Sequence, residues 1–309
     1  MDILTLMFQE LHLKRSIHMQ ANFRAPWSIH IPQESFASFH FVHSGECFLC
    51  FDEQGFLRLK EGDLVLFPKG AARTLCSSPD ESPRLMYDML PPLTPETVYF
   101  PLEHGGSGAL TRLWGGGLFL ENAEDNHILK ALPKAILLRA DEVPSNDWLT
   151  SHMRCLFEEG SANRLGQDLL ISRLSEVLFL HAIRTYVERL PEQSDGFLRA
   201  LQEPRLLPIL QALHHQPGKE WSVASMARKA KMSRASFAQL FPQLLGQTPM
   251  RYLIGVRMQK AARLLKQTRD SVLTIALEVG YQSQPSFSMA FRQHFGLSPR
   301  DFRKQKRVL

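Results

Sequence analysis

Cysteine and long apolar segments are both scarce in this chain of 309 residues. Its four cysteines (Cys47, Cys50, Cys76 and Cys155) are too few for a disulfide scaffold in a chain of this length. No apolar run reaches the roughly 18 residues that a membrane-spanning helix needs. The first residues lack the basic segment and the small-residue cleavage site of a signal peptide. We therefore expect a cytoplasmic protein with no membrane partner.

Acidic residues are also scarce in the C-terminal third. Residues 204–309 contain 18 Lys and Arg against 4 Asp and Glu, a balance of +14. Residues 1–203 contain 18 against 27, a balance of −9. A basic module attached to an acidic body indicates a polyanionic partner for the basic module.

The basic module contains an internal repeat. Its first copy, Ser236-Phe237, Phe241, Gly246, Thr248-Pro249 and Tyr252, is matched fifty positions later by Ser286-Phe287, Phe291, Gly296, Ser298-Pro299 and Phe302. A short helix, a tight turn and a second helix, present twice, offer two matching surfaces to a periodic partner. Double-stranded DNA is such a partner, because its major groove returns to the same side every helical turn.

Each copy also carries the capping pattern of two short helices. We expect serines to cap these helices: Ser222 and Ser233 in the first copy, Ser271 and Ser283 in the second. Gly280 supplies a left-handed residue at the turn of the second copy. Between the copies, a helix from Pro249 to about Lys266 would span roughly 25 Å. Such a rod can hold the two second helices about one DNA turn apart, which is roughly 34 Å.

The second copy carries a dense run of motif residues. They are Ile275-Ala276, Val279-Gly280-Tyr281, Ser283, Ser286-Phe287, Ala290-Phe291-Arg292, Phe295-Gly296, Ser298-Pro299 and Phe302-Arg303. This run closely resembles the signature of AraC-type transcription regulators, and the resemblance covers about residues 205–305. It implies two helix-turn-helix units that read successive major grooves of double-stranded promoter DNA. It also implies RNA polymerase as a further partner and activation as the usual direction of control.

The resemblance places base-reading side chains near the start of the second helix of each copy. They are Ala235, Ala238 and Gln239 in the first copy, and Gln284, Pro285, Ser286, Ser288 and Met289 in the second. Glutamine can pair with adenine, and small or apolar groups can meet a thymine methyl. Phosphate contacts, which position the protein without specifying sequence, are expected from Lys231, Arg234, Arg292 and the basic residues within 303–307.

The N-terminal part has the pattern of an antiparallel β sandwich or small barrel. Short apolar or alternating runs at 35–51, 57–59 and 64–67 are separated by turns. Residues 88–117 are rich in Pro and Gly, and we expect loop or irregular strand there. The triplet Gly115-Gly116-Gly117 indicates tight backbone packing.

Residues 39–47 and 62–73 resemble the two cupin motifs, as found in the sensor half of some AraC-type regulators. An active cupin usually offers two histidines two positions apart, a carboxylate and a later histidine. Here His40 and His43 are three apart and so face opposite sides of a strand. Arg73, which cannot ligate a metal, stands at the later histidine position. We therefore expect no catalytic residue, metal or cofactor. One alternative is a cupin-type metal enzyme with an accessory DNA-binding module, and another is an architectural DNA binder that receives no signal.

Six side chains of this part are candidates for sensing an effector: His40, His43, Arg73, Cys47, Cys50 and Cys76. The histidines could be structural or line a ligand site, and Arg73 could bind an anionic effector or pair with a surface carboxylate. The C-x-x-C pair does not resemble a redox active site, because its two cysteines would face opposite sides of a strand. Thiol oxidation is one hypothesis for the sensor, with purely structural thiols as its alternative. A small-molecule effector in the barrel is the rival hypothesis.

Helical periodicity takes over near Pro144. A long helix at about 163–190 has a broad apolar side, which fits either a homodimer interface or packing against the β domain. The expected organisation is a cupin-like sensor domain at 1–143, a helical connector at 144–190, a linker at 191–203 and a DNA-binding domain at 204–309. The expected fold class is α+β multidomain: an antiparallel β cupin-like barrel, then an all-α double helix-turn-helix domain. The expected function is sequence-specific regulation of transcription, with a small molecule or an oxidant as the signal.

Overall fold

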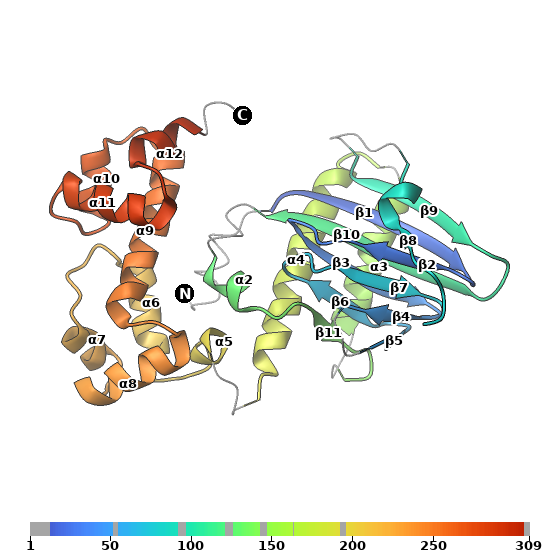
Figure 1. Ribbon diagram of the computed structural model, residues 1–309, viewed down its shortest axis with the longest axis horizontal. Coiled ribbons are helices and arrows are strands. Elements are labelled where there is room, and N and C mark those ends of the chain that lie inside the picture. Colours follow the sequence, from blue (N-terminus) through green and yellow to red (C-terminus); the bar gives the residue numbers. More distant parts are fainter. Residues whose placement is uncertain are drawn as a thin grey trace. The chain divides into compact units, whose positions relative to one another are not determined.

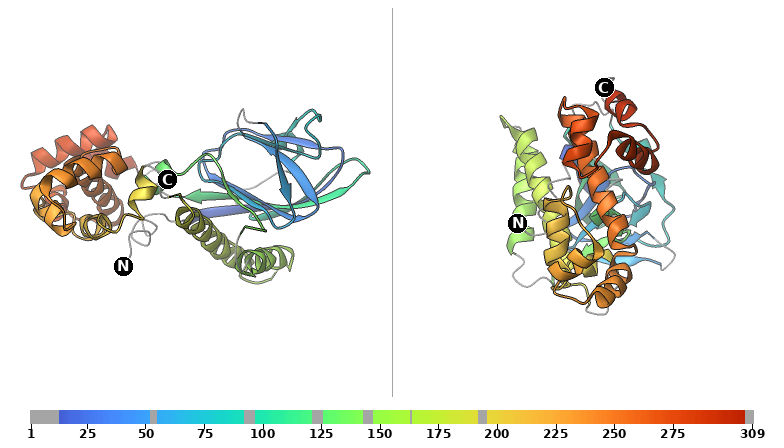
Figure 2. Two further views of the ribbon diagram at one scale, coloured as in Figure 1. Left: turned by 90° about the horizontal axis from the view of Figure 1, so that it is seen from below. Right: turned by 90° about the vertical axis from the view of Figure 1, so that its left-hand side faces the viewer.

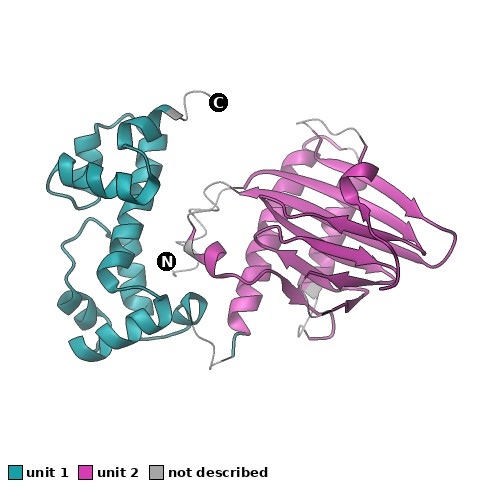
Figure 3. Ribbon diagram, in the orientation of Figure 1, with its two compact units in different colours: residues 1–10, 190–309 teal, residues 11–189 magenta. Residues whose placement is uncertain are grey.

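The structure, a computed structural model, describes residues 13–51, 55–91, 97–120, 126–142, 147–162, 164–191 and 196–305. These residues fall into two compact units, 13–189 and 190–305, coloured separately in Figure 3. No helix within the described ranges is long and apolar enough to cross a membrane.

The first unit contains two β-sheets (Figure 1). The six-stranded sheet has the order β11-β6-β3-β10-β1-β9, and the five-stranded sheet has the order β5-β4-β7-β2-β8. Paired strands run antiparallel except β1 with β9 and β2 with β8, which are parallel. The strands are β1 (Leu13–Arg24), β2 (Ser28–Ile31), β3 (Ala37–Ser44), β4 (Glu46–Cys50), β5 (Leu57–Lys60), β6 (Leu64–Phe67), β7 (Arg73–Cys76), β8 (Arg84–Leu85), β9 (Tyr99–Gly105), β10 (Leu110–Leu120) and β11 (Ile136–Leu138). The predicted cupin-like β fold is confirmed.

The alternating side chains of strand β1 contribute to two layers of the unit, the core between the sheets and the contact with a helix. Met19, Ala21 and Phe23 alternate along it and are buried in the core, together with apolar side chains from both sheets. The residues between them point to the other face, where His18 meets a helix. One side of the six-stranded sheet therefore lines the interior, and the other side carries a helical layer.

That layer is the helix pair α3 (Asp147–Ala162) and α4 (Gln167–Glu188), which lies along one side of the sheets in the left view of Figure 2. The unit also contains η1 (Met86–Met89) and α2 (His127–Ala131). The buried face of α4 includes Ile171, Leu178 and Ala182, so packing against the β layer accounts for this side of the helix. On its other side, the apolar side chains Leu169, Leu170 and Val177 are exposed. Both helices thus belong to the same compact unit as the sheets.

The expectation of loop or irregular strand at 88–117 is wrong for most of the described part of that stretch. β9 and β10 form there, and β10 pairs on both sides inside the six-stranded sheet. Its glycines are the reason for the misleading pattern. A Cβ at Gly116 would lie 2.4 Å from the Phe39 ring, and one at Gly117 would lie 2.8 Å from the Phe36 ring. These glycines admit neighbouring aromatic rings rather than forming a turn, and the predicted tight packing is confirmed.

The second unit is helical. Its elements are α5 (Phe197–Ala200), α6 (Leu207–His215), α7 (Val223–Lys229), α8 (Arg234–Leu245), α9 (Pro249–Gln267), α10 (Val272–Glu278), α11 (Gln284–Phe295) and α12 (Pro299–Gln305). The long helix α9 contacts the pair α7–α8 and the pair α10–α11, which lie toward its opposite ends (Figure 1). Ser222, Ser233, Ser271 and Ser283 each accept a backbone N–H at the start of a helix, as predicted.

The turn inside each pair places one residue in the left-handed region. In the second pair this residue is Gly280, with φ of 91°, as expected. In the first pair it is Lys231, with φ of 55°. Aromatic cores hold the turns together: Phe237 and Phe241 are buried in the first pair, and Phe287 and Phe291 in the second.

Candidate functional site

The start of α8 presents the predicted first-copy residues on one exposed face. Arg234, Ala235, Ala238 and Gln239 are all exposed, because Phe237 and Phe241 turn the opposite face of the helix into the core. Four neighbouring exposed positions in the first two turns of a helix suit entry into a major groove.

The start of α11 presents the second set. Pro285, Ser286 and Met289 are exposed, whereas Gln284 and Ser288 are half-buried. Met289 is 72% exposed, which is high for an apolar side chain of this size. The Ser286 hydroxyl donates to the Ser283 carbonyl at 3.0 Å, so it is already used in the cap.

The predicted phosphate-binding cations divide into two groups. Lys231 and Arg292 are exposed beside the second helices of the two pairs. Arg303 instead donates to the Asp270 carbonyl at 2.7 Å and ties α12 to the residues after α9. The basic residues at 306–307 lie outside the described residues.

Arg257 links the two helix-turn-helix pairs, a role that the sequence gave no reason to assign. From α9 its guanidinium donates to the Pro217 carbonyl at 2.9 Å and to the Lys219 carbonyl at 3.0 Å. It also lies over the Tyr281 ring, at 5.8 Å from the ring centroid. The loop before α7 is thereby joined to the turn before α11. This role can be recognised only in the structure, because the residues that Arg257 contacts are far from it in the chain.

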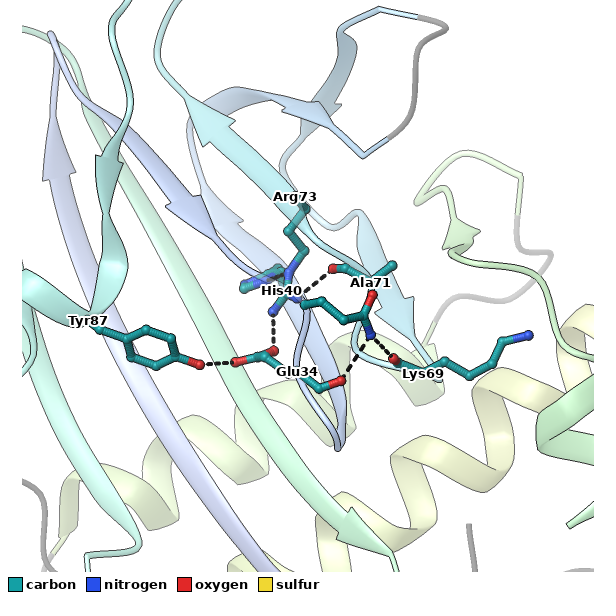
Figure 4. A network of polar contacts seen from close by, with 7 residues as sticks. Glu34, His40, Lys69, Ala71, Arg73 and Tyr87 are labelled. Carbon is teal, nitrogen blue, oxygen red and sulfur yellow. Dashed lines mark hydrogen bonds and ion pairs between the residues drawn. The ribbon is translucent and has the colours of Figure 1, made fainter. Parts of the chain in front are cut away.

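In the first unit, Arg73 and His40 belong to a buried polar network (Figure 4). The Arg73 guanidinium donates to His40 Nε2 at 2.8 Å, to the Ala71 carbonyl at 3.0 Å and to Glu34 Oε2 at 3.1 Å. The Tyr87 hydroxyl donates to the other oxygen of Glu34 at 3.2 Å. Arg73 therefore pairs with a buried carboxylate, not with the surface carboxylate considered from the sequence. Sequence reasoning missed Glu34 and Tyr87, which lie outside the motifs.

The network fixes the protonation of His40. Burial lowers the pKa of His40 well below its usual 6.5, and the Arg73 cation lowers it further, so the ring is neutral. A guanidinium has donors only, so His40 Nε2 must be the accepting nitrogen and Nδ1 must carry the hydrogen. Burial also lowers the pKa of Arg73, and the Glu34 carboxylate opposes that shift.

A cavity of about 250 Å³ opens beside this network. Most of its wall is apolar, and Glu34, His40 and Arg73 of the network are among its lining residues. His43 does not reach it. That ring is exposed and stacks on Phe157 of α3 at 4.8 Å, on the helical side of the sheet. His40 and His43 thus face opposite sides, as their spacing predicts.

All four cysteines are free thiols, and Cys47, Cys50 and Cys76 lie in strands whereas Cys155 lies in α3. Burial raises the pKa of Cys47 to about 12 and that of Cys76 to about 11. Cys47 is buried and Cys50 is half-exposed, in line with their expected opposite directions. Oxidation sensing needs an accessible thiolate, and the surroundings of Cys47 and Cys76 oppose thiolate formation.

Among the described residues, no group of three or more His, Cys, Asp or Glu side chains is arranged to hold a metal ion. A metal-dependent cupin would need a metal-binding nitrogen at the position of Arg73. Here the Arg73 guanidinium donates to His40 Nε2 instead. The geometry gives no support to the alternative of a metal enzyme.

Comparison with known proteins covers both units. Residues 2–188 match the cupin family, and residues 226–305 match the helix-turn-helix domain family. A Haemophilus influenzae protein described as an uncharacterized HTH-type transcriptional regulator is 31% identical over 98% of this chain and 99% of its own length. The RCS-specific HTH-type transcriptional activator RclR of Escherichia coli is 30% identical over 81% of this chain and 78% of its own. The crystal structure of the AdpA DNA-binding domain in complex with a target DNA is 32% identical over 34% of this chain and 94% of that one, with a TM-score of 0.32.

A cupin unit followed by a basic unit with two helix-turn-helix pairs defines a DNA-binding regulator of transcription. The chain belongs to the AraC-type family of these regulators, in the form that carries an N-terminal cupin domain. The relatives named above are transcription regulators and not enzymes.

Proposed function

We propose that this AraC-type regulator is a sequence-specific activator that reads promoter DNA with α8 and α11 and responds to a small molecule held in its cupin unit. The carrying observation is the exposure of the first turns of α8 and α11 on a part of the chain with a balance of +14. Basic charge supplies affinity for any duplex, and side chains that reach base edges supply sequence preference.

The candidate side chains divide by chemistry. Gln239 and Gln284 are proposed to pair with adenine, each through its amide. Ala235, Ala238, Pro285 and Met289 are proposed to meet thymine methyl groups, and Ser288 a base edge beside them. Ser286 is proposed to read DNA only by exchanging its capping hydrogen bond. Lys231, Arg234 and Arg292 are proposed to bind phosphates.

A comparison of glutamine variants tests the base-reading role. Genome-wide footprinting first defines an operator. Gln239→Ala or Gln284→Ala should then weaken operator binding by about 1–3 kcal/mol and relax base preference locally, while binding to random duplex changes little. Gln243→Ala is the matched control, because Gln243 is exposed on the last turn of α8, away from the end that enters the groove. Equal losses on operator and random duplex would refute the base-reading role.

The proposed direction of control is activation, supported by the family and by RclR, a relative named as an activator. An activator is expected to contact RNA polymerase. A homodimer is also proposed, supported by the exposed apolar side chains Leu169, Leu170 and Val177 on α4.

Oxidant sensing is the second candidate, because Cys47, Cys50 and Cys76 lie within thirty residues of each other. The raised pKa values of Cys47 and Cys76 argue against it. Replacing Cys47, Cys50, Cys76 and Cys155 together by Ala separates the two. The small-molecule proposal expects promoter activation by the effector to persist in this variant. Loss of the inducible response, with folding and DNA binding intact, would favour thiol oxidation.

A further inference from the structure

His40 leaves one hydrogen-bond donor without a partner at the wall of the cavity. Its Nε2 accepts from Arg73, so its Nδ1 carries the hydrogen. His40 is 4% exposed, and Nδ1 has no hydrogen-bond partner among the described residues. A buried donor in this state costs free energy that a ligand oxygen can recover.

Gly115 leaves room in front of this nitrogen. A methyl group at Gly115 would lie 3.3 Å from His40 Nδ1 and 3.3 Å from the Met19 terminal carbon. Any larger residue at position 115 would therefore fill the space that the N–H points toward. Ser38, two positions before His40 and on the same side of β3, adds a buried hydroxyl that also has no partner among the described residues.

The charges around the cavity disfavour an anion at this end. The side chains of Arg73 and Glu34 are 2% and 3% exposed and form an ion pair at 3.1 Å. Arg73 also donates to His40 Nε2 and to the Ala71 carbonyl. An added anion would meet an Arg73 charge that Glu34 already neutralises, and removing that anion from water would cost free energy.

The remaining wall selects for apolar groups of moderate size. Met86, Leu90, Phe100 and Phe119 are among its lining side chains. An apolar cavity of about 150 Å³ is enough to accept benzene, so 250 Å³ admits a substituted ring or a short branched chain.

We propose that this cavity binds a neutral, largely apolar small molecule with one oxygen acceptor, such as a ketone or an ester, that takes a hydrogen bond from His40 Nδ1. The inference rests on the proposed effector role of the cupin unit, and it names the chemical class of the ligand. Arg15, at the edge of the cavity, donates to the Thr97 carbonyl and lies over the Phe119 ring. The test must distinguish this proposal from the alternative that an anion binds at Arg15.

Three probes of similar size test the proposal on the full chain without DNA. Acetophenone is neutral with a carbonyl acceptor, ethylbenzene lacks the acceptor, and benzoate is an anion. Calorimetric titration and ligand-dependent thermal shifts give each dissociation constant. We expect acetophenone to bind about tenfold more tightly than ethylbenzene, the ratio of one hydrogen bond to a buried donor. Benzoate should bind more weakly than acetophenone.

Gly115→Ala is the variant to compare with the wild type. His40→Ala would also strip Arg73 of a buried acceptor and could unfold the unit. Gly115→Ala keeps the network and places a methyl group over Nδ1, so it should remove the roughly tenfold preference for acetophenone. Ser16→Ala is the control, because it removes a buried hydroxyl from a β1 position that is not part of the cavity wall, and it should retain the preference.

Equal binding of acetophenone and ethylbenzene, tighter binding of benzoate, or no binding of any probe overturns the proposal. A preference for acetophenone that survives Gly115→Ala also overturns it. The effector role is measured separately, as a change in promoter binding on adding the ligand. If acetophenone binds as expected and no ligand changes promoter binding, the ligand class stands and the effector role fails.

Discussion

At the scale of single residues, burial decides the protonation states in the cupin unit. His18 is fully buried, and burial lowers its pKa to about 3. The Ser175 hydroxyl donates to the Ile171 carbonyl at 2.7 Å, so His18 Nε2 donates to Ser175 across the contact between β1 and α4. Both His18 and His40 are therefore neutral hydrogen-bonding groups in the folded chain at neutral pH.

This neutrality predicts a loss of stability in acid. A histidine with a lowered folded pKa binds its proton more readily when unfolded, so its contribution is complete above about pH 6.5 and is lost as pH falls toward the folded pKa. For His18 the window runs from about 6.5 down to about 3. Each such histidine should lower the free energy of unfolding by up to about 1.4 kcal/mol per pH unit within its window.

Urea denaturation of the wild type and of His18→Gln at pH 7.5 and pH 5 measures this effect. Glutamine can keep the hydrogen bond to Ser175 without titrating. The variant should therefore lose about 2 kcal/mol less than the wild type between the two pH values. An equal loss in both proteins would show that His18 is not the titrating group.

At the scale of elements, the two helix-turn-helix pairs place different residues at the left-handed position of their turns. Gly280 adopts its left-handed φ at no steric cost, but Lys231 adopts φ of 55° against the preference of a residue with a Cβ. The first pair thus stores strain at a position that also carries an exposed cation. The stability of the turn and the proposed phosphate contact make opposing demands on this residue.

Lys231→Gly should therefore stabilise the helical unit while weakening DNA binding. Relief of the left-handed strain, partly offset by the extra freedom of glycine in the unfolded chain, should raise the free energy of unfolding by about 0.5–1 kcal/mol. Loss of a phosphate contact should reduce the salt dependence of DNA affinity by about one unit of slope. Lys231→Ala is the control, because it removes the charge and keeps the strain. Equal stabilisation by Gly and Ala would contradict the strain argument, and an unchanged salt slope would contradict the phosphate contact.

Local signals explain why some elements were predictable from the sequence and others were not. Ser233 and Ser283 cap helices four residues before the first inward phenylalanine, so α8 and α11 follow from neighbouring residues. The strand β1 was missed although Met19, Ala21 and Phe23 alternate, and β10 was missed because its glycines imitate a loop.

The polar network of the cavity depends on contacts between distant residues. Glu34 meets Arg73 across 39 positions, and no short pattern encodes such a pairing. The sequence identified His40 and Arg73 as candidates, but it could not show that they bond to each other. Periodicity finds faces of helices and strands, whereas a buried site is assembled by the sheet topology.

At the scale of the whole DNA-binding unit, the proposed readout of promoter DNA by α8 and α11 depends on the separation of these two helices. The 19 residues of α9 span about 28 Å, close to one turn of DNA. Each pair packs on this rod, and buried side chains of α10 and α11 share one apolar cluster with those of α9. Arg257 adds a direct link between the pairs by donating to the Pro217 and Lys219 carbonyls while lying over Tyr281. Close packing of Gly218 on Gly280 supports the same junction, because a Cβ on Gly280 would lie 2.7 Å from the Gly218 carbonyl oxygen.

Arg257→Ala should therefore weaken binding to a complete operator more than binding to a half operator that engages one recognition helix. The variant loses two hydrogen bonds that hold the pairs in register, and we expect affinity for the complete site to fall about tenfold, or about 1.4 kcal/mol. Arg251→Ala on the same helix removes the same charge from an exposed position and is the control. It should affect complete and half operators alike, by a charge effect that shrinks as salt is raised. If Arg257→Ala also weakened both sites equally, Arg257 would act through its charge and not by holding the two pairs at a fixed separation.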